Sequence, residues 1–431
     1  MKKALYAVVF AVLLVATTFF LAVVPSLAFA ESDTNADTSY KETDEYKFLA
    51  DFVTNHPVRA EDVRLGSELA AAEYLKTQFE QLSSGILGDD ASKFSCQLMN
   101  FDANGLMRAN VVATLQANDA VNQIIIGAHY DSDGGEGAND NASGITALYF
   151  TMQRLLNSYN DLKVNVVFIA FGAEEQGMIG SNHYVASMLE MDKDRTLVMF
   201  NFDVIANGDN LYLFAENKRT ALADFVLSCS SGSVKITEKP YAYGTYPIIS
   251  NGFGYYETIQ NTDFAPFRLA GIPTVAYYSG NYRLWDYVES TDASKRTMNT
   301  DGDTLDNLNR NGAVFVERIK SVVASVSQTV LDDGFMEVAL NARNQLANND
   351  LLSSIWWPRL IVLAVAAILF AFALWHLRKL QKNAILGTAE VKRTTVFNSP
   401  DAEDVFSFQN DQGRPHKNKN DDIDDIFTFK K

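Results

Sequence analysis

The residues from Ile124 to Gly144 include side chains whose types and spacing suit the binding of a divalent metal ion. A run of β-branched residues leads into His129 and Asp131, and a glycine-rich loop then leads to Asp140. An imidazole nitrogen is a good zinc ligand. A carboxylate two residues further along an extended chain points to the same side and can hold the other ring nitrogen. The alternative is a polar loop with one hydrogen-bonded histidine after a core strand, and this segment alone does not decide between them.

Two later segments place further carboxylates after apolar strands. Val164–Phe171 precedes the pair Glu174 and Glu175, and Leu197–Phe202 precedes Asp203. Polar residues at the carboxyl ends of parallel strands meet at one edge of the sheet. There, a divalent cation would offset the mutual repulsion of the carboxylates. Nitrogen and oxygen ligands without thiolate suit a catalytic zinc or a related ion. Adjacent glutamates suit a division in which one binds metal and the other accepts a proton from metal-bound water.

The apolar pattern predicts an α/β fold with a mostly parallel, twisted central sheet and helices on both faces. Continuous apolar runs are typical of parallel strands that are covered on both sides, and segments with helical spacing alternate with them. The predicted strands are Gln123–Ala128, Val164–Phe171, Leu197–Phe202 and Thr274–Tyr278, and the predicted helices are Glu45–Asn55, Ser67–Leu82, Ser143–Leu156 and Val314–Leu331.

The amino-terminal segment predicts export of the rest of the chain. Lys2 and Lys3 precede a long apolar run, and Ala28-Phe29-Ala30 has the small residues of a signal-peptidase site. We therefore expect a signal peptide at 1–30, with an uncleaved membrane anchor as the alternative. A polar spacer at 31–44 would come next, and then a folded domain at 45–331.

The carboxyl-terminal part predicts a membrane anchor. After a juxtamembrane stalk at 332–355, we expect a single transmembrane helix at 356–377, because Leu360–Trp375 carries no charge and tryptophans flank it. Arg378, Lys379 and Lys382 come directly after it, so the positive-inside rule places the carboxyl terminus in the cytoplasm. The expected location is therefore a single-pass cell-membrane protein with its folded domain outside.

Residues 378–431 are polar, and we expect a disordered cytoplasmic tail. The tail contains a near-repeat of acidic residues followed by aromatic ones, which predicts docking to a cytoplasmic partner at two places. Chance similarity in a biased segment is the alternative. The aromatic residues of the repeat are Phe406, Phe408, Phe427 and Phe429.

Composition excludes some classes of protein. The formal net charge of −17 in 431 residues argues against nucleic acid as a partner. Two cysteines exclude a disulfide scaffold and a thiolate zinc cluster. The 47% hydrophobic content argues against global disorder.

Over most of Glu45–Leu331 the sequence resembles the dizinc aminopeptidases, family twenty-eight of the metallopeptidases. The resemblance implies a zinc exopeptidase-like fold, with 45–331 as the catalytic domain. Several motifs in the same order make the resemblance specific. The matching segments are Arg64–Leu82, His129–Asp131, Gly137–Gly144, Ala173–Ser181, Asn201–Asp203, Asp263–Val275 and Asp303–Asn307.

The resemblance implies a set of metal ligands. His129 and Asp203 would bind one zinc, Asp140 would bridge to a second ion, and Glu175 would bind that second ion. The peptide bond after Asp140 would be cis. His183, which lies on the next predicted helix, is interpreted as a surface histidine rather than a ligand.

The resemblance also implies Glu174 as the general base and Asp131 as the residue that orients His129. One position departs from the family pattern, because Asn299 stands where the last histidine ligand is expected, with Met298 in place of a tyrosine. An amide oxygen is a poorer zinc ligand than imidazole. We therefore expect a second site formed by oxygen atoms, with Asn299 or Asp301 completing it, that suits Mn²⁺, Mg²⁺ or Ca²⁺.

Together these features predict an exported, membrane-anchored, zinc-dependent aminopeptidase. It would remove amino-terminal residues from peptides by means of a metal-bound water that Glu174 activates. Two alternatives stay open. One is a non-catalytic receptor or scaffold with a degenerate metal site, which the asparagine at 299 favours. The other is acyl transfer like that of glutaminyl cyclases.

Overall fold

The computed structural model describes residues 38–60, 67–133, 135–215, 220–238, 262–283, 286–353 and 356–397. The chain divides into two units, Met1–Leu352 and Ser353–Lys431. The signal peptide expected at 1–30 and the tail aromatics lie outside the described residues, so these expectations stay predictions. The tail aromatics are Phe406, Phe408, Phe427 and Phe429.

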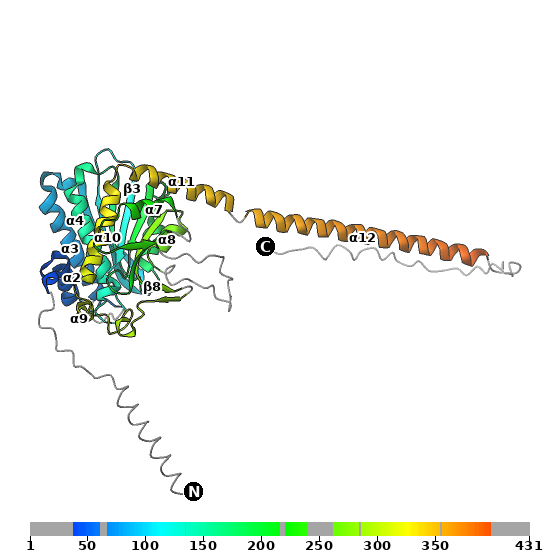
Figure 1. Ribbon diagram of the computed structural model, residues 1–431. Helices are drawn as coiled ribbons and strands as arrows, with labels where there is room; N and C mark the ends of the chain where they lie inside the picture. The colour runs from blue at the N-terminus through cyan, green and yellow to red at the C-terminus, as the bar shows by residue number, and fades with distance from the viewer. Residues whose placement is uncertain are drawn as a thin grey trace, which may run out of the picture. The chain divides into compact units, whose positions relative to one another are not determined.

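The first unit is built on a mixed sheet whose centre is parallel (Figure 1). In its described part, eight strands succeed one another in the order β1-β2-β4-β3-β5-β8-β6-β7, and β9 pairs with β8. The pairs β4–β3, β3–β5 and β5–β8 are parallel, whereas β1–β2, β2–β4 and β6–β8 are antiparallel. The strands are β1 (Phe94–Ala103), β2 (Leu106–Leu115), β3 (Gln123–His129), β4 (Asn165–Phe171), β5 (Thr196–Phe202), β6 (Asn210–Phe214), β7 (Ile236–Glu238), β8 (Thr274–Arg283) and β9 (Asp286–Val288).

Helices cover both faces of this sheet. Figure 1 shows α4 and α10 on one side of the strands and α8 on the other. The described helices of the first unit are α2 (Asp44–Asn55), α3 (Ser67–Leu87), α4 (Ser143–Asn157), α5 (Ile179–Ser187), α6 (Glu190–Arg195), α7 (Ala221–Ser228), α8 (Phe264–Leu269), α9 (Leu305–Asn309), α10 (Val314–Leu331) and α11 (Phe335–Ser353), with short helical turns at η1 (Ser39–Glu42) and η4 (Ala138–Ala142).

The central strands separate two apolar cores, one on each face of the sheet. In β3, Ile124 and Ile126 pack into the larger core with α2, α3, α4 and α10, whereas Ile125 faces the smaller core with α5 and α8. Successive side chains of a strand point to opposite faces, so a strand covered on both sides must be apolar throughout. This requirement explains the uninterrupted apolar runs, and the expected α/β fold with helices on both faces is confirmed.

The folded body is longer than 45–331 at both ends. Tyr40, assigned to the polar spacer, is buried, and its ring packs against Phe315 of α10 with a centroid distance of 5.7 Å. Phe335, assigned to the stalk, is 1% exposed and packs against Phe200. Packing therefore extends past both expected boundaries, because one or two large apolar side chains in a polar segment are enough to attach it to the core.

The second unit contains α12 (Trp356–Phe397). Its segment Leu360–Asn383 is 24 residues long, has a mean hydropathy of 2.6 and is long and apolar enough to cross a membrane. The helix continues past residue 377 to Phe397, so residues 378–397 are helical where the sequence predicted disorder. A formed helix propagates easily through residues of good helix propensity, and this segment is rich in them.

The packing of α11 on the body predicts a loss of stability when Phe335 is truncated. Phe335→Ala should lower the free energy of unfolding of the body by about 3 kcal/mol, the cost of removing a buried phenyl ring. Urea denaturation of the full chain in detergent, monitored by circular dichroism, measures this change. Leu340→Ala is the matched control, because Leu340 lies on the same helix and is 39% exposed. An equal effect of the two substitutions would show that α11 is a stalk rather than part of the body.

Candidate metal centre

Three neighbouring parallel strands bring their carboxyl ends to the same edge of the sheet. His129 is the last residue of β3, Glu174 and Glu175 lie just after β4, and Asp203 lies directly after β5. The sheet order β4-β3-β5 makes these ends adjacent. The positions result from local sequence, because each apolar run must end where the chain meets polar surroundings.

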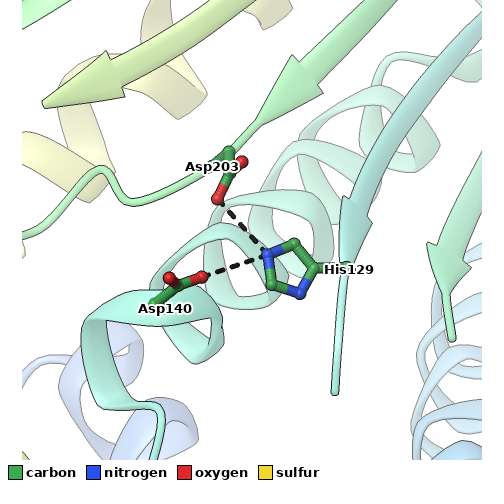
Figure 2. A group of neighbouring side chains, drawn as sticks. All are labelled: His129, Asp140 and Asp203. Carbon is green, nitrogen blue, oxygen red and sulfur yellow. Dashed lines mark hydrogen bonds and ion pairs between the residues drawn. The ribbon is translucent and has the colours of Figure 1, made fainter. Parts of the chain in front are cut away.

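The imidazole of His129 lies between carboxylates. Its Nε2 is 3.1 Å from Oδ1 of Asp140 and 3.3 Å from Oδ1 of Asp203. Both carboxylates point toward this nitrogen (Figure 2). Its Nδ1 is 3.3 Å from Oδ1 of Asp131. The ring is 2% exposed. The first two carboxylates therefore converge on one ring nitrogen, and Asp131 holds the other.

Asp131 connects the imidazole to the glutamate turn. Its Oδ1 faces His129, and its Oδ2 accepts a hydrogen bond from the backbone N–H of Glu175 at 3.1 Å. A carboxylate with both oxygens engaged fixes the ring orientation and the turn after β4 together.

Asp140 lies in the short turn η4, before α4. The peptide bond between Asp140 and Asn141 is cis, as the resemblance implies. The side chain of Asn141 donates to the carbonyl of Phe202 at 2.8 Å and thereby attaches this turn to the end of β5. A Cβ at Gly144 would collide with the Asn141 amide and the Phe202 carbonyl, so this position requires glycine.

Asp303 also holds the turn η4, which carries Asp140. Its Oδ1 accepts from the N–H of Asn139 and its Oδ2 from the N–H of Asp140, each at 2.8 Å. The sequence motif Asp303–Asn307 contributed to the resemblance, but no role was predicted for Asp303. Its position beside Asp140 makes it a support of the proposed ligand turn.

Buried polar side chains also hold the glutamate turn. Glu68 of α3 accepts from the N–H of Ala173 at 3.0 Å and pairs with Arg108 at 2.6 Å. Asn110 of β2 accepts from the N–H of Gly172 at 3.1 Å. Ala173 itself adopts a left-handed conformation with φ 53°, which turns the chain sharply at the end of β4. This turn carries Glu174 and its neighbour into the site.

A buried arginine that the sequence analysis did not identify lies behind the loop. Arg59 is 0% exposed, and its guanidinium donates to the carbonyls of Tyr130 at 2.5 Å, Glu136 at 2.8 Å and Gly137 at 3.0 Å. It is therefore a cation fixed by the backbone of the loop that carries Asp131 and Asp140. No local signal identifies it, because a single arginine after a helix is usually a surface residue.

The acids repel one another strongly in the protein alone. Burial, together with the charge of Asp140, raises the pKa of Glu175 to about 9, and burial raises the pKa of Glu174 well above its ordinary value. Burial acts to lower the pKa of His129, but the charge of Glu174 and the hydrogen bonds to the aspartates outweigh it, so that this pKa is raised. These pKa shifts indicate a site with excess negative charge, which a bound cation would offset.

The donor set fits a divalent metal ion. The ligand atoms of His129, Asp140 and Asp203 lie within 4.8 Å of one another, and the same holds for His129, Glu174 and Glu175. In the described part of the chain, Oε1 of Glu175 is buried and has no hydrogen-bond partner. A single imidazole with carboxylates and no thiolate matches zinc at a catalytic site.

The structure brings together six of the seven residues predicted for the site. The seventh, Asn299, is exposed and adopts a left-handed conformation with φ 55°. His183 stacks on Phe101 with a centroid distance of 5.4 Å, as a helix-surface histidine can. The roles of all seven as ligands or catalytic groups stay predictions. The six that come together are His129, Asp131, Asp140, Glu174, Glu175 and Asp203.

The fold and this cluster define a class of α/β protein with an acid-rich, metal-compatible site at the carboxyl edge of its sheet. Residues 110–324 match the model of Peptidase family M28. The chain belongs to this family, and the expected resemblance to the family is confirmed.

Curated relatives support the same assignment. Leupeptin-inactivating enzyme 1 of Streptomyces exfoliatus is 28% identical over 221 residues, which are 50% of this chain and 45% of that protein. An aminopeptidase of Pseudomonas aeruginosa is 41% identical over 175 residues, 40% of this chain and 31% of that one. The chain thus spans less than half the length of the curated relatives it matches.

Similarity to solved structures supports the fold. The crystal structure of LapB from Legionella pneumophila superposes with a TM-score of 0.51 at 20% identity, covering 70% of this chain and 76% of that one. At this identity the likeness shows the fold alone.

The acid cluster predicts that zinc stabilises the protein. Zinc at one hundred times its dissociation constant should stabilise the folded state by about 2.7 kcal/mol, because an ion that binds only the folded chain shifts the unfolding equilibrium. Calorimetry of the metal-stripped full chain, with and without zinc, measures the shift in Tm. His129→Ala should abolish the shift, and the control His183→Ala should retain it. A full shift in His129→Ala would remove the imidazole from the proposed ligand set.

Proposed function

We propose that the chain is a metal-dependent aminopeptidase that hydrolyses the amino-terminal residue from peptides, with zinc at the His129 cluster. The observation that carries the proposal is the convergence of Asp140, Asp203 and the glutamate pair on one buried imidazole. Membership of family M28 and relatives named as aminopeptidases support it.

His129, Asp140 and Asp203 would hold one ion, and Asp140 with Glu175 would hold a second. Bound there, zinc supplies Lewis-acid polarisation of the scissile carbonyl and of the attacking water. Asp131 keeps the imidazole in the ring orientation that leaves Nε2 facing Asp140 and Asp203. The protein thus contributes a fixed set of ligands that does not need to reorganise during the reaction.

Glu174 is the proposed general base. It is 8% exposed and belongs to the same cluster as His129 and Glu175. It would accept a proton from the attacking water and then donate that proton to the nitrogen of the scissile peptide bond, which leaves as the amine of the shortened peptide. A cation beside Glu174 favours the ionised carboxylate that the first step needs. The surplus of carboxylates also suits the free ammonium group of a peptide amino terminus.

We further propose that the protein is exported and anchored by Leu360–Asn383, with the body outside the cell and the carboxyl terminus in the cytoplasm. The length and hydropathy of this helix support the anchor, and the basic residues near its carboxyl end support the orientation.

Asn299 favours a second candidate function, that of a non-catalytic receptor or scaffold. An exposed asparagine at the position of a histidine ligand weakens the second metal site. The intact cluster around His129 supports catalysis instead, because buried acids with strongly shifted pKa values more often serve chemistry than structure.

Replacement of the proposed base tests the enzyme function. Glu174→Gln should lower kcat on an aminoacyl nitroanilide by about 10²- to 10⁴-fold, the usual contribution of a general base, while zinc binding is retained. A substrate with an acetylated amino group should not be cleaved. Glu190→Gln, at an exposed position of α6, is the control and should leave kcat unchanged.

Turnover that is unaffected by Glu174→Gln would reject this mechanism. A folded wild-type chain that shows no turnover with zinc or manganese would favour the scaffold.

Restoration of the histidine tests the second metal site. Asn299→His should raise the zinc retained after dialysis from about one ion per chain to about two, because imidazole binds zinc more strongly than an amide oxygen does. Elemental analysis of the full chain gives the count, and Asn299→Ala is the control that should leave it unchanged. Two tightly held zinc ions in the wild-type chain would contradict a weakened second site.

A further inference from the structure

Glu289 is a buried carboxylate that receives hydrogen bonds from three separate segments of the chain. It lies directly after β9 and is 5% exposed. Its Oε1 accepts from the side-chain amides of Asn139 at 3.3 Å and Asn207 at 2.7 Å. Its Oε2 accepts from the backbone N–H groups of Thr297 at 2.5 Å and Met298 at 3.0 Å.

Each of these segments carries a residue of the proposed metal site. Asn139 directly precedes Asp140, and Met298 directly precedes Asn299. Asn207 follows Asp203 in the connection between β5 and β6. One side chain therefore joins the segments whose relative positions must be kept for the proposed ligands to converge.

The two asparagine amides have fixed orientations. Oδ1 of Asn139 accepts from the N–H groups of Ala206 and Asn207, each at 3.0 Å, so its NH₂ group points to Glu289. Oδ1 of Asn207 accepts from the side chain of Asn311 at 2.9 Å, so its NH₂ group also points to Glu289. Neither amide can rotate to offer an oxygen instead without losing these bonds.

Four donors thus face the side chain at residue 289, and this arrangement requires a carboxylate. An ionised glutamate has two oxygens with acceptor sites for all four N–H groups. A glutamine would place its own NH₂ group against two donors and leave them without an acceptor. Hydrogen bonds to an ionised acceptor are also stronger than neutral ones.

We propose that Glu289 is a positioning residue of the metal centre, which sets the relative placement of the turns carrying Asp140, Asp203 and Asn299. This inference rests on the proposed function, since it takes these residues to be metal ligands. Glu289 would act through the backbone and amides of the neighbouring residues, because it belongs to neither group of described side chains that could hold the ion.

The test compares Glu289→Gln and Glu289→Ala with Asp209→Asn in the metal-stripped full chain. Asp209 is the matched control, because it accepts from Ser290 at 2.7 Å, Thr291 at 2.9 Å and Asn281 at 2.8 Å and so anchors the same loop away from the proposed ligands. Zinc affinity is measured by competition with a chromophoric chelator, and the visible absorption of bound Co²⁺ reports the ligand geometry.

Both Glu289 substitutions should weaken zinc binding by about 10- to 100-fold, as loss of an outer-shell partner does, and should alter the Co²⁺ spectrum. Asp209→Asn should change neither. If Glu289→Ala fails to fold by circular dichroism, the isosteric Glu289→Gln decides. Zinc affinity of Glu289→Gln equal to that of wild type, or an equal loss in Asp209→Asn, overturns the proposal. Failure of the wild-type chain to bind zinc would instead overturn the proposed function.

Discussion

The mutual repulsion of buried carboxylates around one imidazole is the constraint on which this structure depends. Two like charges 4 Å apart repel by about 4 kcal/mol at the effective dielectric constant of a protein near its surface. At this site Asp140 and Asp203 share one ring nitrogen of His129, and two glutamates lie beside them. Such a cluster persists only where the surrounding chain prevents the acids from moving apart or turning to solvent.

The surrounding chain meets this constraint with N–H donors and one buried cation. Asp303 is held by the backbone of the Asp140 turn, and Asp131 is held by the backbone of the Glu175 turn. Arg59 lies behind the loop and donates hydrogen bonds to carbonyl oxygens of that loop. Its positive charge is therefore not neutralised by a single carboxylate. The acids therefore stay ionisable and in place, which is what a site that takes up a cation requires.

Local sequence predicted the central strands and the polar residues at their ends, because both result from short-range rules. A strand buried on two faces must be apolar, and its end must be polar, so β3, β4 and β5 and the residues after them could be found without coordinates. Arg59 and Glu289 could not be found in this way. Each has partners 70 or more positions away, as the bonds from Arg59 to Tyr130 and from Asn207 to Glu289 show. The packing of Tyr40 and Phe335 on the body could not be predicted for the same reason, since it depends on contacts with a distant helix and a distant strand.

The proposed site has two parts, the His129 cluster and the residues expected at the second ion, and the fold holds the first part in place more firmly than the second. His129, Asp140 and Asp203 are each at most 7% exposed and are carried by β3, by the turn before α4 and by the end of β5. Glu175 is more exposed, and Asn299 lies on an exposed turn. A ligand group enclosed by strand ends keeps its geometry. A group on an exposed turn keeps its geometry only if contacts from other segments hold that turn in place. The carboxylate of Glu289, which binds the backbone just before Asn299, is one of the groups that link this turn to the enclosed part, together with the side chain of Asn207. The proposed departure at residue 299 would therefore fall on the part of the site that the sheet defines least, where a change of ligand would leave the cluster around His129 intact.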